Sequence, residues 1–365
     1  MTPPLIASAR LINQRIADTD FTKPSEIVRW MGAMQAQDYF MAKRAIGLRI
    51  KNATDKSVEI AFSRGEFLRT HLLRPTWHFV APEDIRWMVR LSAPQIKIQM
   101  RARDRQLELT ETVFTKSNLI LGKFLSEKGN ATRDEISEEL NNSGIKTDDS
   151  RLSHLMSHAE LDEIICSGPL KGRKQTYALL EERVSRHKDL NHEESLAELA
   201  LRYFTSHGPA TVIDFSWWSG LSLTKARQAL EMVKQMLLHE NSGSETYWFK
   251  DSLINDVLIE NSVHLLPAFD EYLISYRNRS VSIDSDNTRK AISSNGIFRP
   301  LIVINGRVEG IWKRTIQKDI VFIEMTLFRS PEKTALKAIE SAVLKYGDFL
   351  ELRTRLSLIS KTSAG

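Results

Sequence analysis

One order of elements recurs along this sequence, and it constrains the fold more than any other feature. Short helical segments joined by tight turns lead into two short strands in residues 5–80, 130–183 and 194–250. Helices followed by a two-stranded hairpin are typical of a winged-helix unit, so the pattern predicts three such units in tandem. The chain has 365 residues, which also exceeds what one hydrophobic core usually serves.

The clearest copy lies in residues 130–183. Thr132 and Glu135 have the spacing of a capping box, which predicts a helix start, and Asp149 or Ser150 can cap a second helix. Two strand-like runs follow, separated by a polar, glycine-containing tip. The cations of this predicted wing tip are Lys171, Arg173 and Lys174.

The first copy, residues 5–80, is less regular. Helical segments are predicted at 8–17, 24–35, 42–49 and 57–63, and strands at 67–73 and 76–80. The basic side chains and histidines of this hairpin are Arg69, His71, Arg74 and His78.

Helix signals dominate much of the third copy, whereas strand signals dominate the C-terminal part of the chain. In the third copy Thr211 and Ser222 are predicted helix caps. From residue 262 onward strands dominate, and Asn305-Gly306 favours a tight hairpin turn. Residues 281–295 are predicted to form an exposed loop, and Ser330 with Pro331 is predicted to start the last helix.

Together these signals predict a mainly helical α+β protein. We expect a first winged-helix unit with connecting helices in 1–125, a second in 126–190, a third in 191–260, and a β-rich region with a final helix in 261–365.

The composition limits the classes of binding partner, cellular location and cofactor that we expect for this chain. Lys plus Arg number 51 against 46 Asp plus Glu, a net charge of +5 that leans mildly toward polyanionic partners. No uncharged apolar run is long enough to span a membrane, and a lone cysteine, Cys166, forms no internal disulfide and no zinc or iron–sulfur cluster. We therefore expect a cytoplasmic protein with neither metal nor other cofactor.

Four blocks of the sequence resemble a known family. They are Arg29-Trp30-Met31-Gly32-Ala33-Met34-Gln35-Ala36-Gln37-Asp38, Arg74-Pro75-Thr76-Trp77-His78, Ser206-His207-Gly208-Pro209-Ala210-Thr211 and Pro267-Ala268-Phe269-Asp270-Glu271-Tyr272. The chain is similar, from about residue 7 to residue 328, to the AlkZ/YcaQ-type winged-helix DNA glycosylases. The segment from Gly306 to Arg314 also resembles the β-region of that family.

The resemblance implies three winged-helix units around a concave DNA-binding surface. It further implies a monomeric, monofunctional DNA repair glycosylase, nucleoid-associated in the cytoplasm, that removes N7-alkylated purines from double-stranded DNA, interstrand crosslinks included. The family's catalytic motif, two glutamines around a variable residue, is matched by Gln35-Ala36-Gln37. The alternative is a non-catalytic winged-helix DNA-binding protein or transcriptional regulator, which would have no reason to hold this motif.

Two glutamines are too weak as bases to deprotonate water, so their predicted role is to position it. An N7-alkylated purine is already cationic and leaves without an acid catalyst. Amide oxygens can hold a water against the anomeric carbon and favour the positive charge that develops there. We expect Gln35 to Gln37 at a helix C-terminus that runs into a turn. Asp38, the nearest carboxylate, is interpreted either as electrostatic support or base, or as a helix-end or salt-bridge residue.

The predicted DNA contacts are the basic side chains of the two hairpins, with phosphate as the expected target. They are Arg69, Arg74, His78, Lys171, Arg173 and Lys174. One of His71 and His78 is alternatively a buried, hydrogen-bonded residue.

Three further pairs have competing interpretations. His154 and His158 lie four residues apart, as metal ligands on a helix can, but further ligands are missing nearby, which favours plain polar-face histidines. For the adjacent tryptophans at 217 and 218, core packing is favoured over base stacking. The adjacent carboxylates at 270 and 271 have no assigned chemical step, and we expect salt bridges to Arg277 or Arg279.

Overall fold

The computed structural model describes residues 1–250 and 257–360. Residues 251–256, at the end of the third predicted unit, and 361–365 lie outside the described residues. The chain divides into two compact units. Unit 1 comprises Met1–Glu59, Ala197–Trp218 and Ser222–Gly365, and unit 2 comprises Ile60–Leu196 and Ser219–Leu221.

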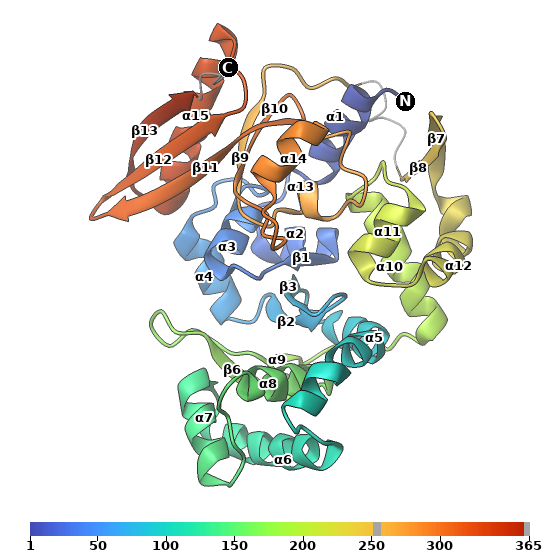
Figure 1. Cartoon of the computed structure of the whole chain (residues 1–365), viewed down its shortest axis with the longest axis vertical. Helices are drawn as coiled ribbons and strands as arrows, with labels where there is room; N and C mark the ends of the chain where they lie inside the picture. Colours follow the sequence, from blue (N-terminus) through green and yellow to red (C-terminus); the bar gives the residue numbers. More distant parts are fainter. Residues whose placement is uncertain (251–256, 361–365) are drawn as a thin grey trace. The chain divides into compact units, whose positions relative to one another are not determined.

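Unit 1 combines helices from both ends of the chain with one large sheet (Figure 1). Its helices are α1 (Pro3–Asn13), α2 (Pro24–Met31), α3 (Tyr39–Gly47), most of α4 (Asp55–Ser63) and α10 (His192–Ser206), α11 (Val212–Ser219), α12 (Leu223–Val233) with the 3-10 turn Lys234–Met236, α13 (Glu271–Ile274), α14 (Ser285–Ala291) and α15 (Lys333–Leu350). It also contains the short strand β1 (Ala33–Gln35) and the hairpin of β7 (Leu238–Ser242) and β8 (Glu245–Phe249).

The sheet of unit 1 has five strands in the order β13-β12-β11-β10-β9. They are β9 (Val263–Leu266), β10 (Leu301–Ile304), β11 (Arg307–Gln317), β12 (Ile320–Leu327) and β13 (Arg353–Ser360). All neighbours are antiparallel except β12 and β13, which α15 connects as a parallel crossover (Figure 1). Alternate residues of β12 are buried, as expected of a strand with one face on a core.

The predicted hairpin turn is confirmed. Asn305 and Gly306 both have positive φ, at 51° and 78°, between β10 and β11. This is the backbone that a type I′ turn requires, and asparagine and glycine adopt it most readily. A Cβ at Gly306 would lie 2.7 Å from the Cβ of Ala7, so glycine is also needed for the approach of α1.

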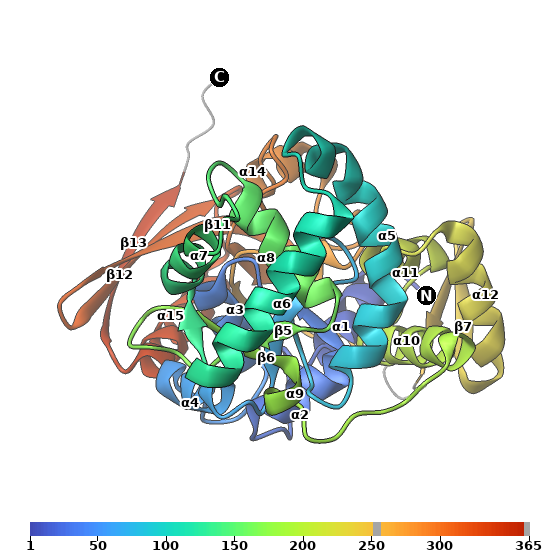
Figure 2. The ribbon, with the colours of Figure 1, turned by 90° about the horizontal axis from the view of Figure 1, so that it is seen from below.

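Unit 2 is mostly helical and contains α5 (Ile85–Gln106), α6 (Glu111–Lys128), α7 (Arg133–Asn142), α8 (Arg151–Leu161) and α9 (Leu180–Arg183). β2 (Leu68–Leu72) and β3 (Thr76–Val80) form an antiparallel hairpin, and β4 (Ala131–Thr132), β6 (Thr176–Leu179) and β5 (Ile165–Ser167) form a small sheet. Figure 2 shows α6 beside α7 and α8, which it contacts.

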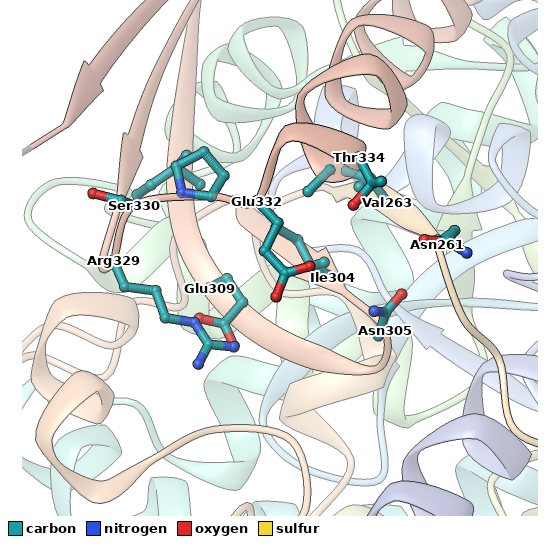
Figure 3. A pocket seen from close by; sticks show the side chains of 12 residues that line it. Asn261, Val263, Ile304, Asn305, Glu309, Arg329, Ser330, Glu332 and Thr334 are labelled. Atoms are coloured by element: carbon teal, nitrogen blue, oxygen red, sulfur yellow. The ribbon is translucent and has the colours of Figure 1, made fainter.

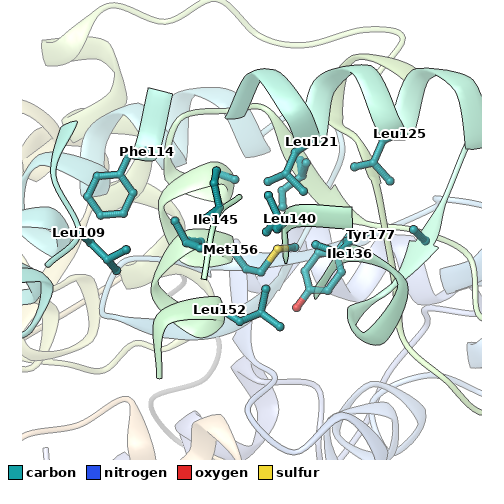
Figure 4. Close-up of a cluster of buried hydrophobic side chains, with 14 of the residues drawn as sticks. Leu109, Phe114, Leu121, Leu125, Ile136, Leu140, Ile145, Leu152, Met156 and Tyr177 are labelled. Carbon is teal, nitrogen blue, oxygen red and sulfur yellow. The ribbon is translucent and has the colours of Figure 1, made fainter. Parts of the chain in front are cut away.

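The core of unit 2 lies between α6, α7 and α8. Leu121 and Leu125 point from α6 toward Ile136 and Leu140 of α7, as Figure 4 shows, and all four side chains are fully buried. Full burial of such side chains stabilises a fold by roughly 1.5–3 kcal/mol each. The capping box predicted at the start of α7 is confirmed, since Thr132 accepts from the Glu135 amide and the Glu135 carboxylate accepts from the Thr132 amide.

The mixture of helices and strands confirms the α+β class. The winged-helix assignment and the fourfold division of the chain stay predictions. Two local expectations were wrong. The polar segment 281–295 contains α14, with Asp284 at its N-cap position, instead of forming a loop throughout, and the N-cap position of the last helix is Glu332 instead of Ser330. Strand β13 was not anticipated, because its pairing with β12 depends on residues distant in sequence.

Candidate functional site

The segment with the two glutamines connects a strand to a helix. Helix α2 ends at Met31, where Gly32 turns the chain with a φ of 77°, and β1 follows directly. Helix α3 then starts at Tyr39, with the Asp38 side chain accepting a hydrogen bond from the Met41 amide at 3.1 Å. The expectation of a helix C-terminus at Gln35 was wrong, because the positive φ of Gly32 ends α2 four residues earlier. The helix-end interpretation of Asp38 is confirmed.

The two glutamines differ in exposure. Gln35 is 6% exposed at the end of β1, whereas Gln37 and Asp38 are exposed in the turn before α3. The backbone N–H of Gln35 donates to Oε1 of Glu271 at 2.5 Å, which ties this segment to α13. The segment is therefore fixed at Gln35 by a hydrogen bond to a buried carboxylate, whereas Gln37 is exposed to solvent.

Glu271 is a fully buried carboxylate with several partners. Its Oε2 accepts from Nε1 of Trp218 at 3.2 Å and from the hydroxyl of Ser275, and Nε2 of His207 lies 3.7 Å away. Burial opposes ionisation of Glu271, but the contacts with His207, Ser275 and the Gln35 amide outweigh it and lower its pKa to about 2. At neutral pH this group is an anion that accepts hydrogen bonds, not an acid that could protonate a leaving group.

A second buried carboxylate lies next to the first in sequence. Asp270 forms a bidentate ion pair with Arg49, with N···O distances of 2.7 and 2.8 Å and both side chains fully buried. Arg49 also donates to the main-chain and side-chain oxygens of Gln14. The prediction that Asp270 forms a salt bridge with Arg277 or Arg279 was therefore wrong. Arg49 lies 221 residues away in sequence, and only the tertiary fold brings it there.

This network extends around α1. Gln14 donates to the hydroxyl of Tyr276 at 2.9 Å, and that hydroxyl donates to the carbonyl oxygen of His207 at 2.6 Å. The guanidinium of Arg10 lies 3.6 Å from the ring centre of Tyr276 and donates to the carbonyl oxygen of Pro209. These hydrogen bonds tie α1 to the backbone at His207 and Pro209.

The first hairpin belongs to unit 2. The Arg69 guanidinium stacks on Trp77, 4.2 Å from the ring centre, and the Arg69 amide donates to Oγ of Ser167 in β5 at 2.8 Å. Arg74 is half-buried between the two strands. His78 is fully buried with Nδ1 3.0 Å from the Thr76 carbonyl oxygen, so the DNA contact predicted for His78 has no exposed atom to make it.

The other hairpin histidine is also buried. His71 is 9% exposed, and its Nδ1 lies 2.5 Å from Oε2 of Glu160, which also accepts the His71 amide. Its ring packs on Trp77 at 4.5 Å between ring centres. The interpretation of His71 as a buried, hydrogen-bonded residue is therefore confirmed.

The tip between β5 and β6 is basic and exposed, as the sequence predicts. Lys171 pairs with Glu135 at 2.8 Å and Lys174 pairs with Asp134 at 2.9 Å, both from α7. Arg173 is exposed, and no carboxylate among the described residues pairs with it. Of the three cations, Arg173 therefore has the charge that is least compensated inside the protein.

Asp104 explains the histidine pair on α8. It accepts from Nδ1 of His154 at 2.5 Å through one oxygen and lies 3.1 Å from Nε2 of His158 through the other. His158 is buried against Phe114, so its placement on a polar helix face was wrong. Within residues 1–250 and 257–360, no group of three potential ligands of the His, Cys, Asp and Glu types comes together.

The tryptophan pair is split between core and surface. Trp218 is fully buried, which confirms the core-packing prediction for this residue. Trp217 is half-buried and donates from Nε1 to the carbonyl oxygen of Ile274 at 2.8 Å.

A pocket of about 230 Å³ lies where β11 and β12 meet the N-terminus of α15. Figure 3 shows Arg329 beside Glu309 in this pocket, and the two form an ion pair at 2.6 Å. Burial is the main influence on Glu309 and raises its pKa. This pocket contains none of the residues that the sequence predicts to be catalytic or to contact DNA, and its arginine is already paired.

Sequence reasoning missed the support of the glutamine segment. Asp270 and Glu271 were noticed as a pair in a family-like block, but nothing local indicates that one would hold Gln35 and the other Arg49. The signal in the sequence was a pair of adjacent carboxylates beside apolar residues. Carboxylates in such a segment are rarely buried unless each has a charged or hydrogen-bonding partner.

The chain matches a protein family, a named relative and a solved structure. The model of the family described as "DNA glycosylase AlkZ-like" matches residues 28–349. An interstrand DNA cross-link repair glycosylase of Streptomyces sahachiroi is 24% identical over 343 residues, which cover 87% of this chain and 89% of that protein. The solved structure of Streptomyces sahachiroi DNA glycosylase AlkZ has a similar fold, with a TM-score of 0.81 at 19% identity, covering 98% of this chain and all of the other. Among the described helices, none is long and apolar enough to cross a membrane.

Proposed function

Because the chain belongs to the AlkZ-like DNA glycosylase family, we propose that it hydrolyses the N-glycosidic bond of N7-alkylated purines in double-stranded DNA. The similar Streptomyces protein is named for interstrand crosslink repair, which supports crosslinks as a further substrate. The observation that carries the proposal is the segment Gln35-Ala36-Gln37, held at one end by a buried carboxylate and exposed at the other.

The proposed chemistry needs no proton on the leaving group. Alkylation at N7 makes the purine cationic, so it departs as a neutral base when its bond to the sugar breaks and leaves an oxocarbenium-like sugar. One water adds to the anomeric carbon, and its released proton passes to solvent. The product is an abasic site with the DNA backbone intact.

In this mechanism Gln35 and Gln37 position the water. Their amide oxygens accept its hydrogens, so that a lone pair faces the anomeric carbon, and the negative ends of the amide dipoles favour the positive sugar. Such assistance is worth several kcal/mol when the groups are held in place before the reaction. The hydrogen bond from the Gln35 amide to Glu271 supports this requirement, since it fixes the backbone from which Gln35 extends.

The exposure of Gln37 supports substrates too large for a closed pocket. A base that is crosslinked to the opposite strand cannot be turned out into an enclosed cavity, so a site for it must be open. Gln37 and Asp38 are both exposed in the turn before α3, which fits an open site.

The test is direct. Purified protein is incubated with a duplex that carries one N7-methylguanine, and the DNA is then heated in alkali, which cleaves abasic sites. We expect strand cleavage at the lesion and none in an unmodified duplex. A protein that only binds DNA would shift both duplexes in a gel but leave them uncleaved, and that result across several N7-alkylated lesions would overturn the proposal.

A further inference from the structure

Arg44 is a buried cation that forms no ion pair with the carboxylates of the described residues. It lies in the last turn of α3, with 6% of its surface exposed. Among the described residues no carboxylate pairs with Arg44, and its Nε has no hydrogen-bond partner. Both oxygens of Asp270 are taken by Arg49. An unpaired buried charge costs several kcal/mol, so such a group is expected to have a partner that comes from outside the chain.

The aromatic rings around Arg44 do not replace that partner. Its guanidinium carbon lies 5.2 Å from the ring centre of Tyr346 and 5.1 Å from that of Phe349, both in α15. Burial lowers the pKa of Arg44 to about 10, which leaves it charged at neutral pH. Cation–π contacts at such distances contribute only about 0.5–2 kcal/mol.

Arg44 lines a cavity of about 410 Å³ bounded by α3, β9 and α15. His264 of β9 and Lys345 of α15 also line it and bring side-chain nitrogens from two further elements. Within the described part of the chain, the buried Nε2 of His264 has no hydrogen-bond partner. Three elements thus contribute nitrogen donors to one cavity.

The remaining charges of the cavity leave these donors uncompensated. Lys51 lines it and pairs with Asp20 at 2.9 Å. The lining carboxylates Asp18 and Asp348 are exposed, and among the described residues neither forms an ion pair with Arg44 or Lys345. Exposed carboxylates are screened by water, whereas the buried guanidinium is not.

We propose that this cavity binds a phosphate group, with Arg44 as its main ligand and His264 and Lys345 as further donors. A guanidinium fork matches two oxygens of a phosphate, and a tetrahedral anion offers a further oxygen to donors from other directions. The phosphate is either free in solution or part of a DNA backbone. The site lies at the opposite end of α3 from Asp38, so it is separate from the glutamine segment, and its occupation by free phosphate does not depend on the proposed glycosylase activity.

The first test measures thermal unfolding in sodium phosphate and in sodium chloride of equal ionic strength. Phosphate stabilises proteins in general, so the measured quantity is the extra shift of the parent over the variants. We expect Arg44→Met to raise Tm in chloride, because it removes an unpaired buried charge, and to lose a phosphate-specific shift on the order of 2 °C.

Lys345→Gln is expected to weaken the phosphate-specific shift in Tm but to leave Tm in chloride unchanged. It also provides the test if Arg44→Met does not fold. The matched control is Lys337→Gln, which removes the same charge from an exposed position of α15 outside the cavity and is expected to keep the full shift. An undiminished phosphate shift in both Arg44→Met and Lys345→Gln overturns the proposal.

The second test identifies the source of the phosphate. The affinity for an unmodified duplex is measured as a function of salt for the parent, Lys345→Gln and Lys337→Gln. If the cavity takes a backbone phosphate, Lys345→Gln reduces the slope of log affinity against log salt by about one and Lys337→Gln does not. An unchanged slope together with a lost phosphate shift assigns the cavity to a free phosphate compound. Neither result depends on base excision, so a failure here is distinct from a failure of the proposed function.

Discussion

The backbone amide of Gln35 donates a hydrogen bond to the carboxylate of Glu271, 236 residues further along the chain, at 2.5 Å. Glu271 is anchored in turn by Trp218 and Ser275. The proposed water-positioning segment therefore rests on a buried anion that does not itself reach the solvent. We regard Glu271 as a positioning residue.

Replacement of this anion is the first prediction. Glu271→Gln keeps the size of the side chain but replaces the charged acceptor with a neutral one, and hydrogen bonds to charged groups are worth about 1.5–3 kcal/mol. We expect single-turnover excision of N7-methylguanine to slow by roughly 10- to 100-fold while the affinity for the duplex stays unchanged. Glu309→Gln, in the pocket beside α15, is the matched control and should leave the rate intact. A loss of affinity without a loss of rate in Glu271→Gln would contradict this role.

Stability in acid is the second prediction. The pKa of Glu271 is about 2 in the folded protein and near 4.5 in an unfolded chain, so the unfolded state binds the proton more readily. The ionised Glu271 therefore adds about 3 kcal/mol to the free energy of unfolding above about pH 4.5, and this contribution is lost as the pH falls toward 2. Urea unfolding at pH 5.5 and 3.5 should show a smaller acid loss for Glu271→Gln than for the parent. Glu309→Gln should show an acid loss at least as large as the parent's, because burial raises the pKa of Glu309 and its protonation therefore stabilises the folded state as the pH falls.

The third prediction concerns the glutamines themselves. Gln35→Ala and Gln37→Ala should each slow excision by about 10- to 1,000-fold, which corresponds to about 1.4–4 kcal/mol of lost transition-state stabilisation. Duplex binding should change little, since the positioned water contributes mainly to the transition state. The measurement is single-turnover excision beside a binding isotherm, with Gln228→Ala on the exposed face of α12 as control. Rates equal to the parent in both variants would remove the pair from the mechanism.

The fourth prediction separates Asp38 from the glutamines. Asp38 caps α3, and a water held by two amides has no ionisation near neutral pH. The single-turnover rate should therefore stay flat from about pH 5 to 7 in the parent, and Asp38→Asn, which can still cap the helix, should resemble it. If a steep fall at low pH occurs in the parent and disappears in Asp38→Asn, the catalytic role passes to Asp38.

The fifth prediction concerns the wing tip. Each lysine or arginine that neutralises a DNA phosphate contributes about 0.9 to the slope of log affinity against log salt. Arg173→Ala should flatten the slope by about one. Lys171→Ala with Lys174→Ala should flatten it by at most two, because these lysines already neutralise Glu135 and Asp134. Lys123→Ala, at an exposed position of α6, is the control, and an unchanged slope in both the Arg173 variant and the double lysine variant would exclude the tip from the interface.

Local features of the fold were predictable from the sequence because neighbours in the chain decide them. A threonine followed by a glutamate three residues later satisfies the orphan amides of a helix start wherever the helix lies, as Thr132 and Glu135 do. Asn305 and Gly306 adopt left-handed backbone at low cost, which makes the hairpin a local decision as well. The Gln35-Ala36-Gln37 motif was instead identified through the resemblance of its sequence block to a known family, and its position after a strand was not predicted.

Only the tertiary structure decided what surrounds that motif. Glu271 reaches Gln35, and Asp270 reaches Arg49, across more than 200 residues of sequence. A buried charge takes whichever partner the packing of distant elements brings within about 3 Å, and no local pattern encodes that choice. The same reason applies to Arg44. In the sequence it is one basic residue among 51, and only its burial beside a cavity, with no ion pair to any carboxylate of the described residues, marks it as a site for an anion.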